Sequence, residues 1–263
     1  MKNIIIKYLW KLLGINRILF QQDQLINALK DELNKQNNKF ENIEKLQKDI
    51  YMAAKFNDSI RDCKWLKYKS FSPGGWAIDY GLMYTLFRIL NDTHPQKILE
   101  FGLGQSSKII HQYTNYYTET QAITYEHDEK WINFFSNSKE GDYTLNIYKT
   151  DLEEIIYNDR ESLSYKNNCA ELKGQRFNLI VIDAPFGTKN YSRPQLLYLA
   201  PSILAEQFCI IMDDYERIGE QNTISELKKI LKENKIDYKE KCYSYSKQHY
   251  IICSPKLQFL LSL

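Results

Sequence analysis

Apolar residues in the first part of the chain recur on a seven-residue pattern. The a and d positions of these heptads are Ile5, Tyr8, Leu12, Ile15, Leu19, Ile26, Leu29, Leu33, Phe40, Ile43 and Ile50, and only Gln22, Gln36 and Gln47 interrupt them. The positions between them are mostly polar, so one face of the resulting helix is apolar and nothing else in the segment covers it. The pattern predicts a helical coiled-coil arm over residues 1–55 that forms a homo-oligomer. A helix packed on its own domain is the alternative.

The first 20 residues, MKNIIIKYLWKLLGINRILF, hold further apolar positions outside that pattern. Lys2, Lys7, Lys11 and Arg17 are spread among them, which argues against a membrane-spanning helix and against a secretory signal. The same mixture of apolar and cationic side chains is typical of a helix that lies on an anionic membrane surface. We therefore expect a cytoplasmic protein. Peripheral contact of this segment with the inner membrane face is a further expectation, and it is compatible with self-association of the arm.

From about residue 56 the pattern changes to short apolar runs that alternate with amphipathic segments. The runs predict strands at 97–101, 122–126, 144–150, 177–184, 207–214, 237–243 and 247–253. Helices are expected over 78–89, from 106, and at 128–137, 193–205 and 220–234. This alternation predicts that residues 56–263 form an α/β domain with a doubly wound sheet, parallel in its first five strands.

Composition narrows the classes of protein that fit. Hydrophobic residues make up 43% of the chain, which is enough for one sizeable core. The 35 Lys and Arg residues nearly balance the 33 Asp and Glu residues, so no basic field favours a nucleic-acid partner. The 5 cysteines are widely spaced without a CxxC pair, which predicts reduced thiols in place of disulfides or a zinc site.

Ligands of doubly wound sheets bind beyond the carboxyl ends of the strands. The first predicted strand there is followed by EFGLGQSS, residues 100–107. Gly102 and Gly104 allow a tight turn close to a ligand, and Ser106 or Ser107 can cap the next helix. Ser107 stands where the dinucleotide-binding GxGxxG pattern has its third glycine, which disfavours an NAD-dependent or nucleotide-sugar enzyme. An ordinary strand-to-helix turn is the alternative.

Acidic residues end the next two predicted strands. The Glu126 carboxylate is suited to accept hydrogen bonds from two vicinal ribose hydroxyls, and Asp151 is suited to meet an adenine amino group. Either residue alone is more often a helix cap, and Asp151 in TDLEE is a good candidate for one. The two acids together, at the ends of successive strands, are a more specific signal.

These motifs together resemble the class I S-adenosylmethionine-dependent methyltransferases over roughly residues 72–253. EFGLGQSS is similar to their first motif, TYEHD to the acidic end of their second strand, and VIDAPFG and IIMDD to their fourth and fifth strands. The resemblance implies a Rossmann-like fold of the methyltransferase type and S-adenosylmethionine as cofactor. It places the amino-acid and sulfonium part of that cofactor among Glu100, Gly102, Gly104, Ser106 and Ser107, the ribose at Glu126 and the adenine at Asp151.

The fourth predicted strand ends in Asp183 and the fifth in Asp213 and Asp214. Neighbouring strands would bring these three carboxylates into one crevice, where Mg²⁺ would supply the counter-charge they need. The pattern is similar to that of metal-dependent O-methyltransferases, both the catechol type and the enzymes that act on macrolide or aminocoumarin sugars. In that family the metal binds two vicinal acceptor oxygens and lowers the pKa of the attacking hydroxyl. Metal-free use of Asp183 or Asp214 as the general base is the alternative.

The resemblance to this family does not identify a definite general base in the sequence. Lys189, in the loop after Asp183, and His249, on the last strand, are further candidates. The loop APFGTKNYSRPQ, residues 184–195, is polar and aromatic, and we expect its Tyr191 and Arg193 to bind the acceptor. A charged surface loop is the alternative.

The sequence thus predicts an O-methyltransferase acting on a sugar or polysaccharide hydroxyl, with other small-molecule hydroxyls as further acceptors. A DNA or RNA acceptor is disfavoured, since the fourth strand ends in DAPF. The alternative is a coiled-coil scaffold whose methyltransferase-like domain has lost catalysis. Such a domain would have no reason to keep the set Glu100, Gly102, Gly104, Glu126 and Asp151.

Overall fold

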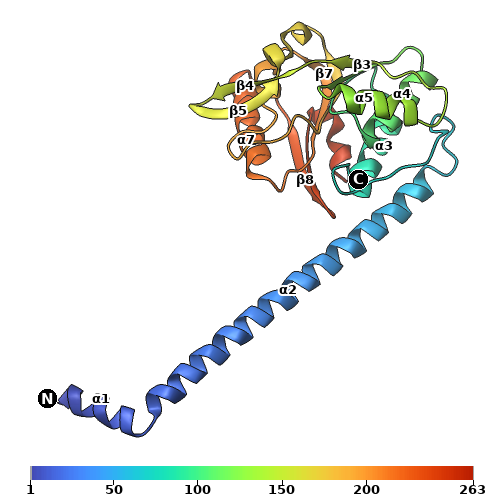
Figure 1. Ribbon diagram of the computed structural model, residues 1–263. Coiled ribbons are helices and arrows are strands. Elements are labelled where there is room, and N and C mark those ends of the chain that lie inside the picture. The colour runs from blue at the N-terminus through green and yellow to red at the C-terminus, as the bar shows by residue number, and fades with distance from the viewer. Residues whose placement is uncertain (1, 263) are drawn as a thin grey trace. The chain divides into compact units, whose positions relative to one another are not determined.

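The computed structural model describes residues 2–262 and contains two compact units (Figure 1). The first unit ends at Lys48 and the second begins at Asp49. Helix α1 (Lys2–Leu12) and helix α2 (Ile15–Ser59) are separated at Gly14, whose φ of 67° does not continue a helix. No helix among residues 2–262 is both long and apolar enough to cross a membrane.

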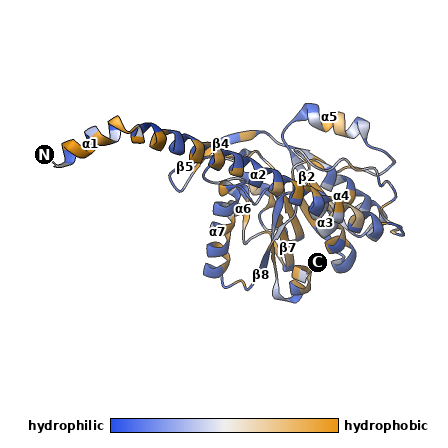
Figure 2. Cartoon of the chain, turned by 90° about the horizontal axis from the view of Figure 1, so that it is seen from below, coloured by the Kyte–Doolittle hydropathy of each residue, from blue (hydrophilic) through white to orange (hydrophobic). Residues whose placement is uncertain are grey.

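Helix α2 confirms the helical arm, and the side chains of its apolar seam, the a and d positions of the heptads, are mostly exposed. Apolar and polar residues alternate along α1 and α2 (Figure 2). The exposed fractions of the seam residues range from 43% to 69%, for Leu19, Ile26, Leu29, Leu33, Phe40 and Ile43. The last turns of α2 belong to the second unit, because Met52 and Phe56 are buried in its core. A partner for the seam stays a prediction.

The second unit is built on a seven-stranded sheet in the order β3-β2-β1-β6-β7-β9-β8. Its strands are β1 (Lys97–Phe101), β2 (Gln121–Glu126), β3 (Ile147–Lys149), β6 (Phe177–Ile182), β7 (Leu204–Met212), β8 (Lys239–Ser244) and β9 (Gln248–Cys253). Strands β3, β2, β1, β6 and β7 are parallel, whereas β9 is antiparallel to both β7 and β8. The predicted Rossmann-like, mostly parallel sheet is confirmed. Its strand order reverses between β1 and β6, where such sheets bind ligands.

Two apolar layers cover this sheet. Leu179 and Val181 of β6 pack in the cluster with helix α3 (Tyr80–Thr93), helix α4 (Gln105–Tyr116) and the end of α2. Ile180 and Ile182 pack in the cluster with helix α6 (Gln195–Leu199) and helix α7 (Ile218–Glu233). Because both faces of β6 are covered, its sequence FNLIVI is a continuous apolar run. The remaining helix, α5 (Glu129–Ser138), follows β2, and the 3₁₀ helices are η1 (Lys166–Leu172) and η2 (Pro255–Ser262).

Two expectations from the sequence differ from the structure. Asp151 precedes no helix, since strands β4 (Leu152–Tyr157) and β5 (Arg160–Tyr165) form an antiparallel hairpin directly after it. Asn158 and Asp159 turn that hairpin with φ values of 48° and 58°, as a two-residue turn requires. The helix expected over 193–205 is only α6 (Gln195–Leu199), because Pro201 disfavours helix at the residue before it and cannot donate a helical hydrogen bond.

Candidate active site

The glycine turn after β1 lies against the backbone after β6. Gly102 has a φ of 103°, a conformation that side chains rarely adopt. A Cβ atom on Gly102 would lie 2.9 Å from the Ala184 Cβ and 3.3 Å from the Ala184 nitrogen. The turn therefore requires glycine at position 102 for two reasons, its backbone angle and its close contact with the β6 loop. Gly104, by contrast, has open space around it.

Glu126 joins the end of β2 to this turn. Its Oε2 accepts a hydrogen bond from the Leu103 nitrogen at 3.0 Å, and its Oε1 accepts from the nitrogens of His127 and Asp128 at 2.7 and 3.0 Å. Burial opposes the charge of Glu126, but these bonds and the His127 side chain outweigh it and lower the pKa of Glu126. The ends of β1 and β2 thus meet at one ionised carboxylate.

Glu100 lies beneath the turn in a network of neutral donors. Its Oε2 accepts hydrogen bonds from the hydroxyls of Ser107 and Thr124, each at 2.7 Å, and the Ser107 hydroxyl in turn accepts from the Gly104 nitrogen at 2.9 Å. Ser106 is also buried. Burial raises the pKa of Glu100 to about 7. Its Oε1 has no hydrogen-bond partner within the described part of the chain.

Asp151 lies at the same edge of the sheet as Glu126. The Thr150 nitrogen donates to the Glu126 carbonyl oxygen at 3.0 Å, which extends the pairing of β3 with β2 to the residue before Asp151. The Asp151 side chain is largely exposed and forms an ion pair with Lys149, which lowers the pKa of Asp151. Its carboxylate is therefore open to solvent at the outer end of the row of strand ends.

The three acidic residues after β6 and β7 converge as the sequence predicts. One carboxylate oxygen from each of Asp183, Asp213 and Asp214 lies within 4.8 Å of the others. The backbone explains this position, because the Asp183 nitrogen donates to the Phe101 carbonyl and the Asp213 nitrogen to the Ile182 carbonyl. These bonds continue the parallel pairings one residue past the strand ends.

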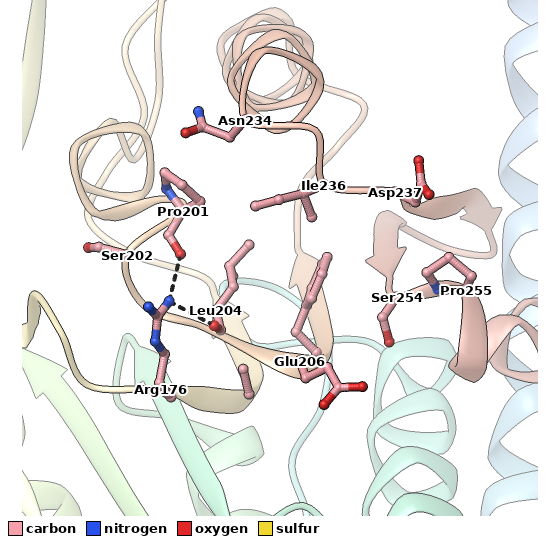
Figure 3. Close-up of a pocket in the computed structure, with 12 residues that line it drawn as sticks. Arg176, Pro201, Ser202, Leu204, Glu206, Asn234, Ile236, Asp237, Ser254 and Pro255 are labelled. Carbon is pink, nitrogen blue, oxygen red and sulfur yellow. Dashed lines mark hydrogen bonds between the residues drawn. The ribbon is translucent and has the colours of Figure 1, made fainter.

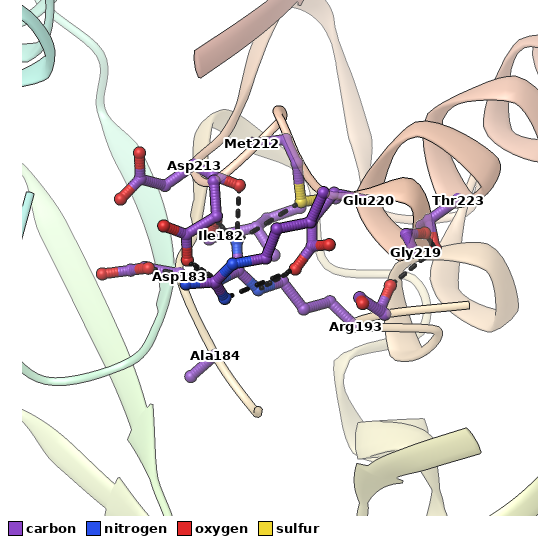
Figure 4. Close-up of polar contacts among 12 residues, drawn as sticks. Ile182, Asp183, Ala184, Arg193, Met212, Asp213, Gly219, Glu220 and Thr223 are labelled. Carbon is purple, nitrogen blue, oxygen red and sulfur yellow. Dashed lines mark hydrogen bonds and ion pairs between the residues drawn. The ribbon is translucent and has the colours of Figure 1, made fainter. Parts of the chain in front are cut away.

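Arg193 supplies the main counter-charge to this trio. Figure 4 shows it beside Asp183, Asp213 and Glu220. Its Nη2 donates to Asp214 Oδ2 at 2.8 Å and to Asp183 Oδ1 at 3.2 Å, and its Nη1 donates to the carbonyls of Asp213 and Ile182. The Arg193 side chain is only 2% exposed. This position contradicts the expectation that Arg193 binds the acceptor from a surface loop, because its donors are already used inside the protein.

Lys247, Arg217 and Glu220 complete the cluster, and the sequence analysis assigned none of the three to it. The Lys247 ammonium lies 3.4 Å from Asp214 Oδ1 and 3.9 Å from Asp213 Oδ2, and Arg217 Nη1 lies 2.9 Å from Asp214 Oδ2. The buried Glu220 lies 3.8 Å from Arg193 Nε. Lys247 arrives here because β9 is antiparallel to β7, which brings the start of β9 to the carboxyl end of β7. No local sequence signal indicates that contact.

The environment separates the acidities of the three carboxyl groups. Burial raises the pKa of Asp183 to about 6 despite the nearby Arg193. Burial together with the two neighbouring carboxylates raises the pKa of Asp213 well above its usual range. For Asp214 burial acts in the same direction, but the cations of Arg193, Lys247 and Arg217 outweigh it and lower the pKa.

A divalent cation does not fit this arrangement. Asp214 Oδ2 and Asp183 Oδ1 are already bound to guanidinium groups, and the Lys247 ammonium faces Asp213 and the remaining Asp214 oxygen. Magnesium needs oxygen ligands at about 2.0–2.1 Å with near-octahedral geometry, which an ammonium among those ligands opposes. The counter-charge that the sequence assigned to Mg²⁺ therefore comes from side chains.

The remaining predicted site residues, His249, Lys189 and Tyr191, lie outside the acidic cluster. His249 is fully buried, with Nε2 3.1 Å from the Thr85 hydroxyl and its ring stacked on Tyr243, and burial lowers its pKa to about 4. This contradicts its expected role as a base, because no acceptor reaches a ring inside the covered sheet. Lys189 is exposed, and Tyr191 packs 5.0 Å from Tyr157 of the β4–β5 hairpin.

Exposed aromatic rings border the edge near Gly102. Phe186, 58% exposed, lies in the loop after Asp183 and contacts Trp76, which is 84% exposed, with 5.9 Å between their ring centroids. The His127 ring lies 5.8 Å from Phe186 on its other side. These rings form a strip, Trp76–Phe186–His127, that connects the loop after β6 with the end of β2.

A hollow of about 470 Å³ lies at the other edge of the sheet (Figure 3). It is lined by residues that include Arg176, before β6, and Leu204, the first residue of β7, so it is at the amino ends of these strands. Arg176 Nη1 donates there to the carbonyls of Pro201 and Leu204. This hollow is separate from the acidic residues described above.

No protein-family model and no curated protein sequence matches the chain. Among solved structures, an O-methyltransferase from Bacillus cereus in complex with S-adenosylhomocysteine (SAH) is 13% identical, with 79% of this chain and 90% of that chain covered and a TM-score of 0.43. SAH-bound PaMTH1 of Podospora anserina is 15% identical over 80% of this chain and 86% of its own, with a TM-score of 0.41. TomG of Streptomyces achromogenes, an O-methyltransferase in complex with SAM, is 9% identical over 77% and 89%, with a TM-score of 0.42. Likeness at this level leaves the activity to be argued from the site.

Proposed function

We propose that this protein transfers the methyl group of S-adenosylmethionine to a hydroxyl oxygen. The observation that carries the proposal is the contact between Glu126 Oε2 and the Leu103 nitrogen inside the glycine turn. It brings the acid after β2 and the turn after β1 to one point, as recognition of the cofactor's ribose beside its sulfonium requires. Glu126 Oε2 accepts one protein hydrogen bond, so it keeps acceptor capacity for a ribose hydroxyl.

Asp183 is the general base of this proposal. Its side chain is 20% exposed, whereas those of Asp213 and Asp214 are 1% and 6% exposed. A carboxyl group with a pKa of about 6 is suited to take a proton near neutral pH. The acceptor hydroxyl gives its proton to Asp183 while its oxygen attacks the methyl carbon in line. The bond from carbon to sulfur breaks, and its electron pair stays on sulfur to give SAH.

A sugar or polysaccharide hydroxyl is the acceptor class we propose. The Trp76–Phe186–His127 strip supports it, because flat apolar rings pack against the C–H face of a sugar ring. A phenolic acceptor would stack on the same rings. Comparing methyl transfer to glycans with transfer to simple phenols distinguishes the two classes.

Isothermal titration of the full-length chain with SAH tests the cofactor assignment. We expect saturable binding, and Asp183→Asn should retain that binding while it loses methyl transfer from labelled S-adenosylmethionine. Glu161→Gln, an exposed residue on the β4–β5 hairpin, is the matched control for a carboxylate lost elsewhere. Absence of SAH binding would refute the proposal and favour the scaffold without catalysis.

We also propose that the arm self-associates through the seam defined above. A helix of 45 residues that exposes apolar side chains at heptad spacing gains stability by burying them against a second copy. Leu29→Glu with Leu33→Glu should lower the mass measured by light scattering, whereas Asn27→Glu with Asn34→Glu, off the seam, should not. An unchanged mass in the seam variant would refute this. Membrane contact of the first 20 residues stays a prediction.

A further inference from the structure

We propose that the Lys247 ammonium takes the place of a divalent cation at the Asp183–Asp213–Asp214 cluster and holds the acceptor oxygen there. The inference rests on the proposed methyl transfer for its acceptor role. The claim that a lysine fills a cation site between acidic residues does not depend on that function, because it is argued only from contacts within this chain.

The position of Lys247 is built by surrounding groups. Asp79 caps α3 by accepting from the Leu82 nitrogen at 2.8 Å, and its other oxygen accepts from the Lys247 nitrogen at 2.9 Å and from the Ser246 hydroxyl at 3.0 Å. The Lys247 ammonium then donates to the Ala77 carbonyl at 2.9 Å. Backbone and side chain of Lys247 are thus both fixed, and its side chain is 16% exposed.

The charges of the cluster balance without a metal ion. Three cations, Arg193, Arg217 and Lys247, face four carboxyl groups, those of Asp183, Asp213, Asp214 and Glu220. A proton on one carboxyl group makes the cluster neutral. A divalent ion added to it would leave an excess of positive charge in a buried site, which low dielectric makes unfavourable.

Asp213 differs from the other two acids of the cluster in its contacts. Its carboxyl group is 1% exposed, and neither oxygen has a hydrogen-bond partner among residues 2–262. The nearest cation is the Lys247 ammonium at 3.9 Å, which is longer than a hydrogen bond. Beside Asp213, Lys247 and Asp183 are the members of the cluster that an acceptor hydroxyl can reach, because their side chains are 16% and 20% exposed.

The replacement changes what the acceptor must contain. A metal of this reaction type chelates two vicinal oxygens, whereas an ammonium offers separate N–H donors to single oxygens. One N–H of Lys247 is on the Ala77 carbonyl and a second faces Asp214 Oδ1 at 3.4 Å, so the third remains for the attacking oxygen, whose developing charge it stabilises. Lys247 keeps its own proton, and the acceptor needs only one hydroxyl at the site.

Binding of Mn²⁺ to the full-length chain, followed by electron paramagnetic resonance, tests this without knowledge of the acceptor. We expect no saturable binding by the wild type. Lys247→Met, which removes the ammonium and keeps most of the length, should bind Mn²⁺ saturably. Its dissociation constant should be at least about tenfold below the lower limit set by the wild type, because a like charge within a few ångströms changes ion binding by that factor. Adding Asp213→Asn to Lys247→Met should abolish the new site.

Two controls belong to the same series. Lys256→Met removes a lysine that pairs with Glu206 at the surface and should behave as the wild type. Lys247→Arg keeps the charge and should also bind no Mn²⁺. Lys247→Gln removes the charge with a polar side chain, so it replaces Lys247→Met if that variant does not fold in a thermal melt, and it should gain the same Mn²⁺ binding.

Saturable Mn²⁺ binding by the wild type that Asp213→Asn removes would overturn the proposal, as would a folded Lys247→Met that binds no Mn²⁺. SAH titration of the same samples keeps the two proposals apart. Loss of SAH binding in every variant and the wild type would refute the proposed function, while the Mn²⁺ series would still decide whether Lys247 fills the cation site.

Discussion

The two halves of the candidate site hold their acidic groups in different ways. In the half formed by β1 and β2, Glu100 and Glu126 accept hydrogen bonds from hydroxyls and backbone nitrogens. In the half formed by β6 and β7, Asp183 and Asp214 are paired with cationic side chains. The first half holds its acids with neutral donors and the His127 side chain, and the second is a balanced ionic cluster. A cation such as a sulfonium suits the first, and a hydroxyl that loses a proton suits the second.

The difference also predicts which substitutions lower the folding stability most. Donors of the first half come mainly from residues near each acid in the sequence, such as Ser107 for Glu100 and His127 for Glu126. The cations of the second half come from a loop, a helix cap and a hairpin turn. Removing one buried cation leaves carboxylates without a partner, which costs more than losing one neutral donor.

The largest effect is expected for Arg193→Met. Loss of the guanidinium leaves Asp183 and Asp214 without their buried partner, so the free energy of unfolding should fall by about 3–5 kcal/mol. Urea denaturation measures it. Arg217→Met removes a 46% exposed guanidinium from the same Asp214 and should cost no more than about 1 kcal/mol. Equal losses in the two variants would contradict the role of burial.

The next effect is a pH dependence that belongs to Glu100. The folded state raises its pKa from 4.5 to about 7, so the folded protein holds a proton that the unfolded chain has lost. Stability should therefore fall as pH rises from about 4.5 to 7, by about 3 kcal/mol from this group, and stay level above that range.

Urea denaturation of Glu100→Gln across this pH range tests the assignment. The neutral amide has no proton to lose, so the slope should become shallower, and the remaining slope should include Asp183, whose pKa is also raised. An identical slope in the variant would show that Glu100 does not titrate as described.

A smaller loss of folding stability is expected for Gly102→Ala. The φ of 103° and the contact with Ala184 should cost about 1–3 kcal/mol of stability and weaken SAH binding by shifting the turn. Gly104→Ala is the control, because no atom lies within 4 Å of a Cβ at that position and its backbone is extended. Its stability should change by less than about 0.5 kcal/mol. Indistinguishable melting of the two variants would argue against the strained turn.

The smallest effect is expected for Glu126→Gln. Replacing the carboxylate by an amide removes one charge-assisted hydrogen bond to the cofactor, so SAH affinity should fall by about tenfold. Calorimetric titration measures the change. Glu129→Gln, an exposed residue three positions further, should bind SAH as the wild type does. Unchanged affinity in Glu126→Gln would mean that the end of β2 does not hold the cofactor.

Local patterns predicted the seven strands of the main sheet and the acidic strand ends, but not the strands β4 and β5. β1 lies at its expected residues, and β6 differs from the expected run by only two residues at its end. The reason is that a strand buried on both faces has a continuous apolar run, which the sequence displays directly. The carboxyl ends of parallel strands share one edge, so the convergence of Asp183, Asp213 and Asp214 followed from strand assignment alone.

The β4–β5 hairpin shows a weaker local signal. Its residues alternate between more and less buried positions, with Asn158 and Asp159 as a turn between them. The acidic segment TDLEE, residues 150–154, in which β4 begins, is equally compatible with the start of a helix. Pairing between β4 and β5 decided in favour of strands, and such pairing is a property of two segments together.

What the sequence by itself determined is the order of elements, the glycine turn and the acids at the strand ends, because each of these depends on residues close together in the chain. Only the tertiary structure decided which groups neutralise those acids. Arg193 comes from a loop expected to face the acceptor, and Lys247 comes from a turn brought in by antiparallel β9. Charge pairing has no period along the chain and acts over any sequence separation, so it becomes visible only when the strands are assembled.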